Sequence, residues 1–334
     1  MLHRKVSLIQ APTPLHRLEN ASRELGVELW IKRDDLTGFA GGGNKGRKLE
    51  YLIADIRDSG ADAVVTRGAH QSNFVRQCAG ACAMFGIEFH AATMHWPHPP
   101  GKPVRPADWS EPQSPSGNAL LDDWLGARIH LFPDGDWETL DAHAESIASK
   151  LESEGKRVYR MPSGGSSPVG ALGFVAAVQE ILDQGGAFEN VVFASGSGGT
   201  QSGIAYGLRR ARLNCRAIGV CTDDEPELVD DFARIAEGLD HLLQGDEKMG
   251  PEDFELDLRF HGGGYQAASA EADEAIRFLA RNEGIFLDPV YTGKAFAGVM
   301  AMARGGELPG RTLFWHTGGF PTLFAHGREP TPIG

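Results

Sequence analysis

Segments with the character of buried β-strands alternate with helical patterns along most of the chain. Strands separated by helices at this spacing form parallel sheets that helices cover on both faces. A chain of 334 residues is also too long for one small hydrophobic core. The sequence therefore predicts an α/β fold with two three-layer α/β/α domains and mostly parallel sheets. The expected strands lie near residues 27–35, 63–66, 87–93, 127–132, 157–161, 190–194, 215–221 and 312–319.

A segment rich in glycine and serine interrupts this alternation. Residues 163–173 read SGGSSPVGALG, which is the composition of a connection rather than of a strand. We expect the chain to cross there between two domains. The smaller domain is predicted to hold residues 55–163, and the larger one residues 1–54 together with 164–334.

A lysine stands on the buried face of one predicted helix. Residues 41–51 read GGGNKGRKLEY, and the apolar residues that follow have the spacing of one helix face. Lys45 lies on that face, four residues before Leu49, and Asn44 is the expected N-cap. Burial and the positive end of the helix dipole both favour a neutral, nucleophilic amine that can form a Schiff base. The alternative is a lysine that extends from the first turn to solvent.

A second glycine-rich segment follows a β-branched strand. Residues 190–203 read NVVFASGSGGTQSG, so a strand is expected to end at SGSGGT and a helix to begin there. Glycines let backbone amides approach an anion closely, and a helix N-terminus adds a favourable dipole. The spacing differs from that of a Walker A loop, a dinucleotide fingerprint and a serine-hydrolase elbow. We interpret the segment as a phosphate-binding loop, with a simple tight turn as the alternative.

Three further segments place polar side chains in loops. In GAHQSNFVRQ (68–77), Ser72 and Asn73 would present oxygens and amides at a helix N-terminus, which suits a carboxylate, although plain N-capping explains them as well. Tyr265 in HGGGYQ and Tyr291 in DPVYTGK stand in loops beside glycine. Beside a reactive lysine and a phosphate site, these tyrosines become candidate acids or bases.

The charge balance limits the classes of partner. The net charge is -13 and no basic block offsets it, so neither nucleic acid nor an anionic membrane is an expected partner. The first residues lack the apolar core of a signal peptide, and no segment is as long as a membrane span, so a cytoplasmic location is expected. Cys78 and Cys82 are expected to be small buried groups. His95 and His98 are expected in a solvated loop, and no metal site is expected.

The motifs together resemble one known family. In chain order they are PTPL, IKRDD, GGNKGRKLEYL, QSNFVRQ, SGSGGT, DPVYTGKAFAG and HTGGFP, between residues 12 and 321. They resemble the fold-type-II pyridoxal 5'-phosphate (PLP) enzymes of the D-cysteine desulfhydrase and 1-aminocyclopropane-1-carboxylate (ACC) deaminase family. The resemblance is weakest between residues 96 and 116, where no motif is recognised. The resemblance implies a PLP cofactor in the larger domain, a small amino-acid substrate and a homodimer.

The resemblance also implies roles for individual residues. Lys45 resembles the lysine that forms the Schiff base with PLP, Asn73 the residue that hydrogen-bonds the ring oxygen, and Ser72 an acid/base or nucleophile that also anchors the substrate carboxylate. The expected catalytic residues are Lys45, Ser72, Tyr265 and Tyr291. The expected cofactor-binding residues are Lys45, Lys48, Asn73, Ser197, Gly198, Gly199, Thr200, Thr292 and Thr317. The expected substrate-binding residues are Ser72, Asn73 and Phe74.

Three positions bear on the substrate. Phe74 stands where relatives usually carry a polar residue, and Gly46 stands where a threonine is common, so we expect polar groups to be missing near the reactive lysine. Thr292 stands where ACC deaminases carry a glutamate close to the pyridine nitrogen, whereas desulfhydrase-like members have threonine. A hydroxyl there leaves that nitrogen closer to neutral than a carboxylate does.

These residues lead to one expected reaction and two alternatives. The expected reaction is α,β-elimination from a small amino acid such as D-cysteine, cysteate or β-chloroalanine, which gives pyruvate, ammonia and the leaving group. The first alternative is an ACC deaminase, which Thr292 disfavours. The second is a PLP-binding protein without catalytic activity, which Ser72, Tyr265 and Tyr291 disfavour.

Overall fold

The computed structural model describes residues 4–102 and 114–325, and it has the predicted α/β architecture. Part of the segment without a recognised motif, residues 103–113, lies outside the described residues. The strands are β1 (Leu15–Arg17), β2 (Glu28–Arg33), β3 (Ala63–Ala69), β4 (Glu88–Met94), β5 (Arg128–Leu131), β6 (Val158–Arg160), β7 (Asn190–Ser195), β8 (Arg216–Cys221), β9 (Glu255–Asp257) and β10 (Arg311–His316). The α-helices are α1 (Glu19–Leu25), α2 (Lys45–Ser59), α3 (Asn73–Phe85), α4 (Gly117–Trp124), α5 (Trp137–Ser153), α6 (Pro168–Asp183), α7 (Gly199–Arg210), α8 (Leu228–Leu243), α9 (Ala270–Glu283) and α10 (Thr292–Arg304).

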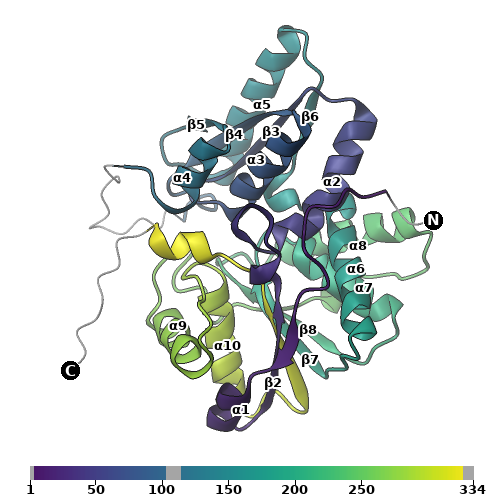
Figure 1. Ribbon diagram of the computed structural model, residues 1–334, viewed down its shortest axis with the longest axis vertical. Helices are drawn as coiled ribbons and strands as arrows, with labels where there is room; N and C mark the ends of the chain where they lie inside the picture. The colour runs from purple at the N-terminus through teal and green to yellow at the C-terminus, as the bar shows by residue number, and fades with distance from the viewer. Residues whose placement is uncertain (1–3, 103–113, 326–334) are drawn as a thin grey trace.

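The larger sheet has six strands in the order β1-β2-β10-β7-β8-β9, and its pairs are parallel except for β1 with β2. Successive side chains of a strand point to opposite faces. Phe314 of β10 therefore packs with α1, α9 and α10 on one face, whereas Leu313 and Trp315 pack with α6 and α7 on the other. Helix α8 lies outside α6 and α7, so this sheet forms the middle of a layered structure (Figure 1).

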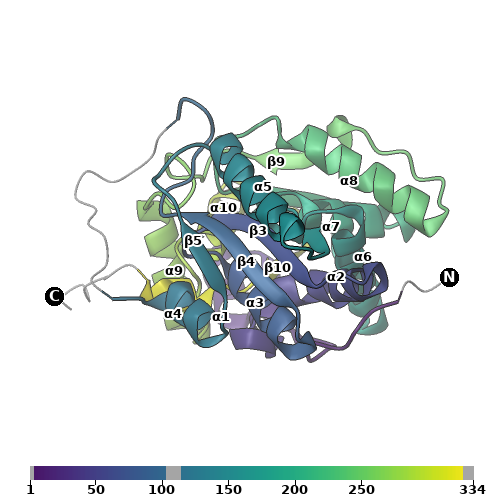
Figure 2. The ribbon, with the colours of Figure 1, turned by 90° about the horizontal axis from the view of Figure 1, so that it is seen from above.

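The smaller sheet has four parallel strands in the order β5-β4-β3-β6. Val64 and Phe89 pack against α2 and α3 on one face, and Val65 and Met94 pack against α5 on the other. Figure 2 shows α5 and α3 on opposite sides of this sheet. Cys78 and Cys82 are fully buried among the apolar side chains on the α3 face, as predicted.

Helix α2 joins the two halves. It packs against α6 of the six-stranded half and against α3 of the four-stranded half. The predicted domain boundary between residues 54 and 55 falls inside this continuous helix. The division into two domains stays a prediction, although the four strands of the smaller sheet all lie between residues 63 and 160.

Two strands were not predicted. β1 and β9 have three residues each and stand at the two edges of the six-stranded sheet. Strands this short have too few residues to display an alternating pattern, and β1 lies in a segment whose prolines predict turns. The other eight strands lie within three residues of their predicted positions.

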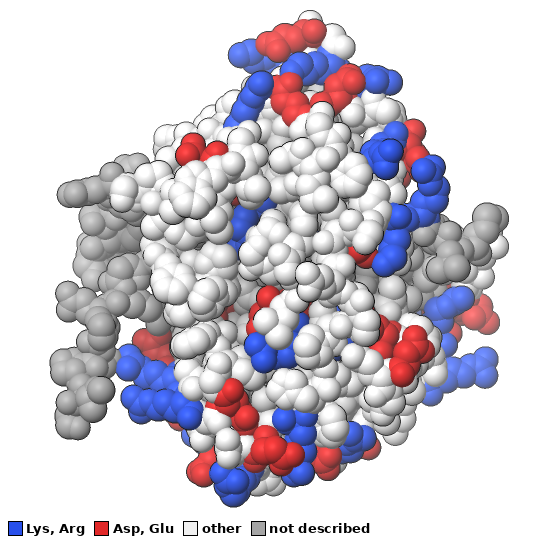
Figure 3. All heavy atoms as spheres, in the orientation of Figure 1, with Lys and Arg blue, Asp and Glu red and all other residues white. Residues whose placement is uncertain are grey.

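Two further features are the distribution of charge on the surface and the length and apolar character of the helices. Acidic and basic side chains lie close together around the rim of the face in Figure 3, and much of its centre is uncharged. Among the described residues, the helices all fall short of the length and apolar character that crossing a membrane requires.

Candidate active site

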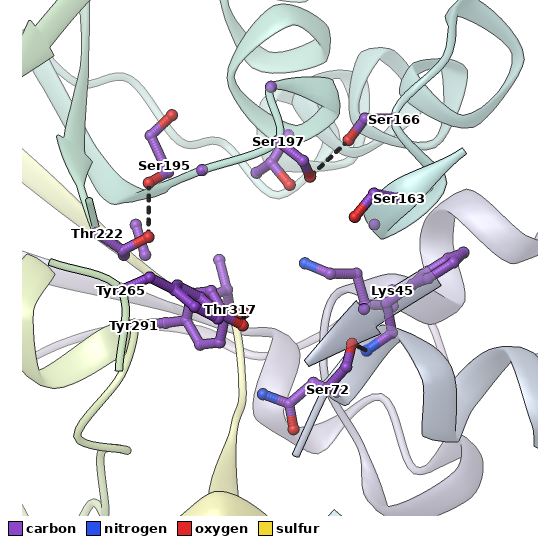
Figure 4. Close-up of a pocket in the computed structure, with 18 of the residues that line it drawn as sticks. Lys45, Ser72, Ser163, Ser166, Ser195, Ser197, Thr222, Tyr265, Tyr291 and Thr317 are labelled. Carbon is purple, nitrogen blue, oxygen red and sulfur yellow. Dashed lines mark hydrogen bonds between the residues drawn. The ribbon is translucent and has the colours of Figure 1, made fainter. Parts of the chain in front are cut away.

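A cavity of about 380 Å³ lies between the two halves of the molecule. It is lined at the carboxyl ends of β3, β7, β8 and β10 and at the first turns of α2, α3 and α7, which is where open α/β sheets bind ligands. Figure 4 shows Tyr265, Tyr291 and Thr317 on one side of the space and Lys45 and Ser72 on another. The predicted site residues among its lining are Lys45, Lys48, Ser72, Asn73, Phe74, Ser197, Gly198, Thr200, Tyr265, Tyr291 and Thr317.

Lys45 begins α2 and faces this cavity, as predicted. Its Nζ donates a hydrogen bond to Asn44 Oδ1 at 3.1 Å. The pKa of Lys45 is lowered to about 8, because desolvation and the nearby Arg76 together outweigh the opposing effect of Asp288. The prediction for Asn44 was wrong in one respect: it precedes the helix, but its side chain caps no backbone amide and its Nδ2 donates to Thr200 instead.

Lys48 is fully buried one helical turn beyond Lys45. Its Nζ donates to the backbone oxygen of Gly164 at 3.0 Å and to Ser166 Oγ at 3.2 Å. Desolvation lowers the pKa of Lys48 well below its usual value, and the charge of Lys45 lowers it further. Among the residues that the structure describes, no carboxylate pairs with this ammonium. A buried cation in this position is suited to an anionic ligand.

The predicted phosphate-binding loop forms the start of α7 beside Lys48. Ser166 Oγ accepts a hydrogen bond from the amide of Gly199 at 3.0 Å and lies 2.8 Å from Ser197 Oγ (Figure 4). A Cβ at position 199 would lie 2.8 Å from Lys48 Nζ, so the close approach of the lysine requires glycine there. Gly198 has a φ of 91° and a Cβ at that position would meet the ring of Phe232.

This donor set fits the phosphate of PLP. The first amides of α7 have no acceptors within the helix, the helix dipole favours an anion, and the Lys48 amine adds donors whose protonated form a bound anion would favour. Lys45 stands in the same cavity with an amine suited to bind the aldehyde carbon of the cofactor. Ser163 and Ser166 also line this part of the cavity, although the sequence predicts them only as part of the connection between domains. Two serines beside glycines just before a helix were the available signal.

Ser72 is the N-cap of α3. Its Oγ accepts hydrogen bonds from the amides of Phe74 at 3.2 Å and Val75 at 3.3 Å, so the capping interpretation is correct. The hydroxyl proton is not used in these bonds, and the residue also lines the cavity. Capping is therefore compatible with the predicted role in the site.

Asn73 is oriented by its side-chain oxygen. This oxygen accepts hydrogen bonds from Arg76 Nη1 at 2.9 Å and from Asn118 Nδ2 at 3.1 Å. An amide has both an acceptor and a donor end, so the Nδ2 of Asn73 remains to donate to a ligand. Phe74 is buried and adds an apolar wall to the cavity, as expected from its side chain.

Tyr265 and Tyr291 both line the cavity and contact each other through their phenol groups. Their phenol oxygens form a short hydrogen bond, and their ring centroids are 5.9 Å apart. Desolvation raises the pKa of Tyr265 to about 12 although the hydrogen bond from Tyr291 lowers it, and desolvation raises the pKa of Tyr291 further. Both phenols are therefore protonated near neutral pH and can deliver a proton. The ring of Trp137 on α5 packs against Tyr265 from the four-stranded half.

Thr292 and Gly46 differ from what the sequence led us to expect. Thr292 is fully buried and does not line the cavity, because its hydroxyl donates to Asp288 Oδ1 at 2.7 Å and accepts from the amide of Asp288. A side chain at position 46 would collide with Ile9 and approach Phe39, so Gly46 is required by packing and removes no polar group from the cavity. Sequence spacing alone could not give these side-chain directions.

Thr317 lies where β10 approaches the lysine loop. Its backbone oxygen accepts from the amide of Asn44 at 2.9 Å. The next residue, Gly318, has a φ of 101°, and a Cβ there would lie 2.5 Å from the Cα of Gly43. The glycines of the motifs GGGNK and HTGG therefore allow two backbones to pass in direct contact.

Five charged or aromatic residues at the cavity were not predicted. They are Arg67, Trp137, Asp223, Glu225 and Asp231. Asp223 is buried, and its Oδ2 has no hydrogen-bond partner among the described residues. Burial and the neighbouring Asp223 and Glu227 raise the pKa of Glu225 to about 7. Asp223 could have been identified from the sequence, because it follows the strand predicted at residues 215–221. The described residues contain no group of three His, Cys, Asp or Glu that could hold a metal ion.

The fold and the site define a class of protein. Two mostly parallel sheets flanked by helices, with a lysine and an anion site in the cavity between them, are the architecture of a fold-type-II PLP enzyme. A solved L-serine ammonia-lyase from Rhizomucor miehei shares this fold, with a TM-score of 0.64 at 15% identity over 94% of this chain and 95% of that one. The chain belongs to the pyridoxal-phosphate dependent enzyme family, whose profile matches residues 6–318. Its cofactor is therefore PLP.

More similar relatives carry a narrower description. A protein of Pyrococcus horikoshii described as "Putative 1-aminocyclopropane-1-carboxylate deaminase" is 38% identical over 97% of this chain and 94% of its own length. A protein of Pyrococcus furiosus with the same description is 37% identical with the same coverage. A solved structure titled as that of an ACC deaminase homologue superimposes with a TM-score of 0.86, at 37% identity over 97% of this chain and 94% of that one.

Proposed function

We propose that the chain is a PLP-dependent lyase that catalyses α,β-elimination from a small amino acid, with pyruvate, ammonia and the β-substituent as products. The observation that carries this proposal is the placement of Lys45, whose amine has a lowered pKa, opposite the Tyr265–Tyr291 pair in one cavity. The amine is a base and the phenols are acids, so the cavity holds both groups that an elimination requires.

PLP supplies an aldehyde carbon that takes up an amine and a conjugated ring that draws electron density away from the substrate α-carbon. Lys48, Ser197, Gly198, Gly199 and Thr200 would hold its phosphate, and the Nδ2 of Asn73 would donate to its ring oxygen. Lys45 Nζ would bind the aldehyde carbon in the absence of substrate. With a pKa of about 8, roughly a tenth of Lys45 is already neutral at pH 7.

The remaining residues act on the substrate. Lys45 Nζ takes the proton from the α-carbon once the substrate amine has displaced it. A phenol of the tyrosine pair donates a proton to the departing β-substituent, and the Oγ–H of Ser72 orients the carboxylate. The C–H bond at the α-carbon and the bond to the β-substituent are broken, a carbon–carbon double bond forms, and water converts the unsaturated amine to pyruvate and ammonia. Phe74 excludes water from one side of the cavity.

ACC deamination is the second candidate, and the descriptions of the relatives favour it. Position 292 supports elimination instead, because Thr292 is buried against Asp288 and brings no carboxylate to the cavity, where the ACC deaminases of the resemblance carry a glutamate. Without that carboxylate the cofactor ring is a weaker electron sink, so a good β-leaving group has to drive the reaction. ACC has no α-proton, and its only leaving group is a strained ring carbon.

Product analysis tests the proposal. The holoenzyme is incubated with the D- and L-forms of cysteine, cysteate and β-chloroalanine and, separately, with ACC. We expect pyruvate and ammonia in equal amounts from one stereochemical series, and little or no 2-oxobutyrate from ACC. A Lys45→Ala variant is the control and should release no pyruvate above the level of free PLP. Efficient formation of 2-oxobutyrate from ACC without elimination would contradict the proposal and support the deaminase.

A further inference from the structure

A second buried lysine stands near the site but outside the cavity lining. Lys294 lies on α10, three residues after Tyr291, and is fully buried. Its Nζ donates to three backbone oxygens: His261 at 2.6 Å, Gly264 at 2.8 Å and Thr222 at 3.2 Å. An ammonium group has three donors, so all of them are used on backbone carbonyls.

Two of these carbonyls belong to the segment that carries Tyr265. Residues 258–269, between β9 and α9, form no helix or strand. Gly262, Gly263 and Gly264 have φ values of 68°, 96° and 143°, so this part of the segment has a backbone that favours glycine. Within the segment, the amide of Gly264 donates to the backbone oxygen of His261 at 3.2 Å and the amide of Ala267 to that of Gly264 at 3.1 Å, so the same two carbonyls also hold the turn together. Lys294 ties it at His261, directly before the three glycines, and at Gly264, the last of them and the residue before Tyr265.

The third carbonyl fixes the lysine to the cavity wall. Thr222 follows β8 and lines the cavity. Lys294 thus joins the end of β8, the start of α10 and the Tyr265 segment at one atom. The same three elements place Tyr265 against Tyr291, whose phenol oxygens share a hydrogen bond.

Packing alone does not explain a lysine at this position. A buried ammonium loses its hydration, and the described residues give Lys294 no carboxylate within ion-pairing distance. Asp223 and Asp288 act on its charge only from farther away, and desolvation lowers the pKa of Lys294 to about 8. A methionine would fill a similar volume without a charge to desolvate, so the three hydrogen bonds are the property that distinguishes lysine here.

We propose that Lys294 is a positioning residue that holds the phenol of Tyr265 against that of Tyr291 by bonding the backbone of the Tyr265 segment. Because its Nζ does not face the cavity, it acts through Tyr265 and touches neither cofactor nor substrate. The proposal rests on the proposed function in one respect, namely that the tyrosine pair is the proton donor of the reaction.

The test uses ¹⁹F NMR of the PLP-loaded protein labelled with 3-fluorotyrosine. The chain has five tyrosines, and the variants Tyr265→Phe and Tyr291→Phe assign the two relevant signals. In Lys294→Met we expect the Tyr265 signal to move towards that of free fluorotyrosine and the Tyr291 signal to shift as well, while the other three stay in place. Unchanged Tyr265 and Tyr291 signals would overturn the proposal.

Lys32→Met is the matched control. Lys32 is also fully buried; its Nζ pairs with Glu180 at 2.5 Å and donates to the backbone oxygen of Thr13 and to Gln184, and none of these residues lines the cavity. We expect this variant to lose stability but to keep both tyrosine signals. Equal shifts of the Tyr265 and Tyr291 signals in Lys294→Met and Lys32→Met would contradict the proposal, because Lys294 would then have only a general structural role. If Lys294→Met does not fold, Lys294→Gln is measured in its place, because glutamine keeps two N–H donors at this position. Shifted Tyr265 and Tyr291 signals again support the proposal, and unchanged signals again overturn it.

Kinetics provide an independent measurement. We expect Lys294→Met to lower kcat roughly a hundredfold, which is the lower end of typical acid–base contributions. In the Tyr265→Phe background the same change should cause no further loss, because residues that act through one group are not additive. Equal losses in both backgrounds would contradict the proposal. If the protein eliminates no β-substituent at all, the proposed function fails, but the NMR result still decides the role of Lys294.

Discussion

At the scale of the residue, Ser72 combines a structural and a chemical role in one hydroxyl. Its oxygen caps α3, and its proton remains for a ligand in the cavity. Ser72→Ala would remove both, at a cost of about 1 kcal/mol in unfolding free energy from the cap alone. We expect PLP to stay bound and kcat/KM for elimination to fall roughly a hundredfold to ten-thousandfold.

Ser72→Gly separates the two roles, because glycine is nearly as good an N-cap as serine. We expect this variant to be as stable as the native protein within a few tenths of a kcal/mol, and as inactive as Ser72→Ala. Thermal unfolding and steady-state kinetics of the two variants make the comparison. An active Ser72→Gly enzyme would mean that the serine is only a cap.

The lowered pKa of Lys45 predicts a pH dependence. An amine is charged below its pKa and neutral above it, so in the cofactor-free protein Lys45 should become nucleophilic near pH 8 rather than near about 10.4, the usual value for lysine. Competitive labelling with acetic anhydride, followed by peptide analysis, measures this midpoint. Lys102 is the internal control, because Asp224 raises its pKa and its labelling should need a higher pH. Identical midpoints for the two lysines would contradict the assignment.

The sequence could predict which residues are reactive but not all of their directions. Lys45 was identifiable because a charged residue on the apolar face of a helix conflicts with its surroundings, and the structure places it in the cavity. Thr292 and Gly46 were assigned to the cavity from their positions in motifs, yet the Thr292 hydroxyl bonds Asp288 and a Cβ at position 46 would meet Ile9. Side-chain direction at a helix start depends on the neighbouring segments, which the local sequence does not contain.

At the scale of the element, a buried ionic cluster fixes α2 and therefore Lys45. Arg47 donates to both oxygens of Asp34 on one side and to Glu180 of α6 on the other. Asp34 also accepts from Trp315 Nε1 of β10, and Lys32 pairs with Glu180 at 2.5 Å. The side chains of β2, α2, α6 and β10 thus meet at one group of charges.

Arg47→Met should therefore be strongly destabilising. It leaves Asp34 buried without its cation, and such a loss typically costs about 3–5 kcal/mol. Urea unfolding of the cofactor-free protein measures the change. Arg4→Met is the control, since the Arg4–Asp58 pair at the other end of α2 is exposed and should contribute below about 1 kcal/mol. Similar losses for the two variants would show that the cluster has no special role.

Element positions were predictable where length and periodicity were sufficient. The strands of the parallel core and the long helices have enough residues for their apolar pattern to be read. The edge strands β1 and β9 form because a neighbouring strand offers hydrogen bonds, and this cause lies far away in the chain. Ser166 was missed for a similar reason, because its partners Gly199 and Lys48 come from other elements.

At the scale of the whole molecule, the cavity lies where the carboxyl ends of strands from both sheets come together. Lys48, Ser166 and Ser197 form one wall, and Tyr265 and Tyr291 come from segments more than sixty residues farther along the chain. The family and its cofactor could be recognised from motifs spread along the sequence, whereas the arrangement of the walls required the folded chain. The homodimer expected from the resemblance stays a prediction, which sedimentation equilibrium would measure.

The most direct test of the account is to locate the cofactor on the chain. The PLP-loaded protein is reduced with borohydride, digested, and its peptides are analysed by mass spectrometry. We expect one modified residue, Lys45, and no reducible adduct in Lys45→Ala. Modification of Lys48 or Lys294 in place of Lys45 would contradict the assignment of the cavity and of every role derived from it.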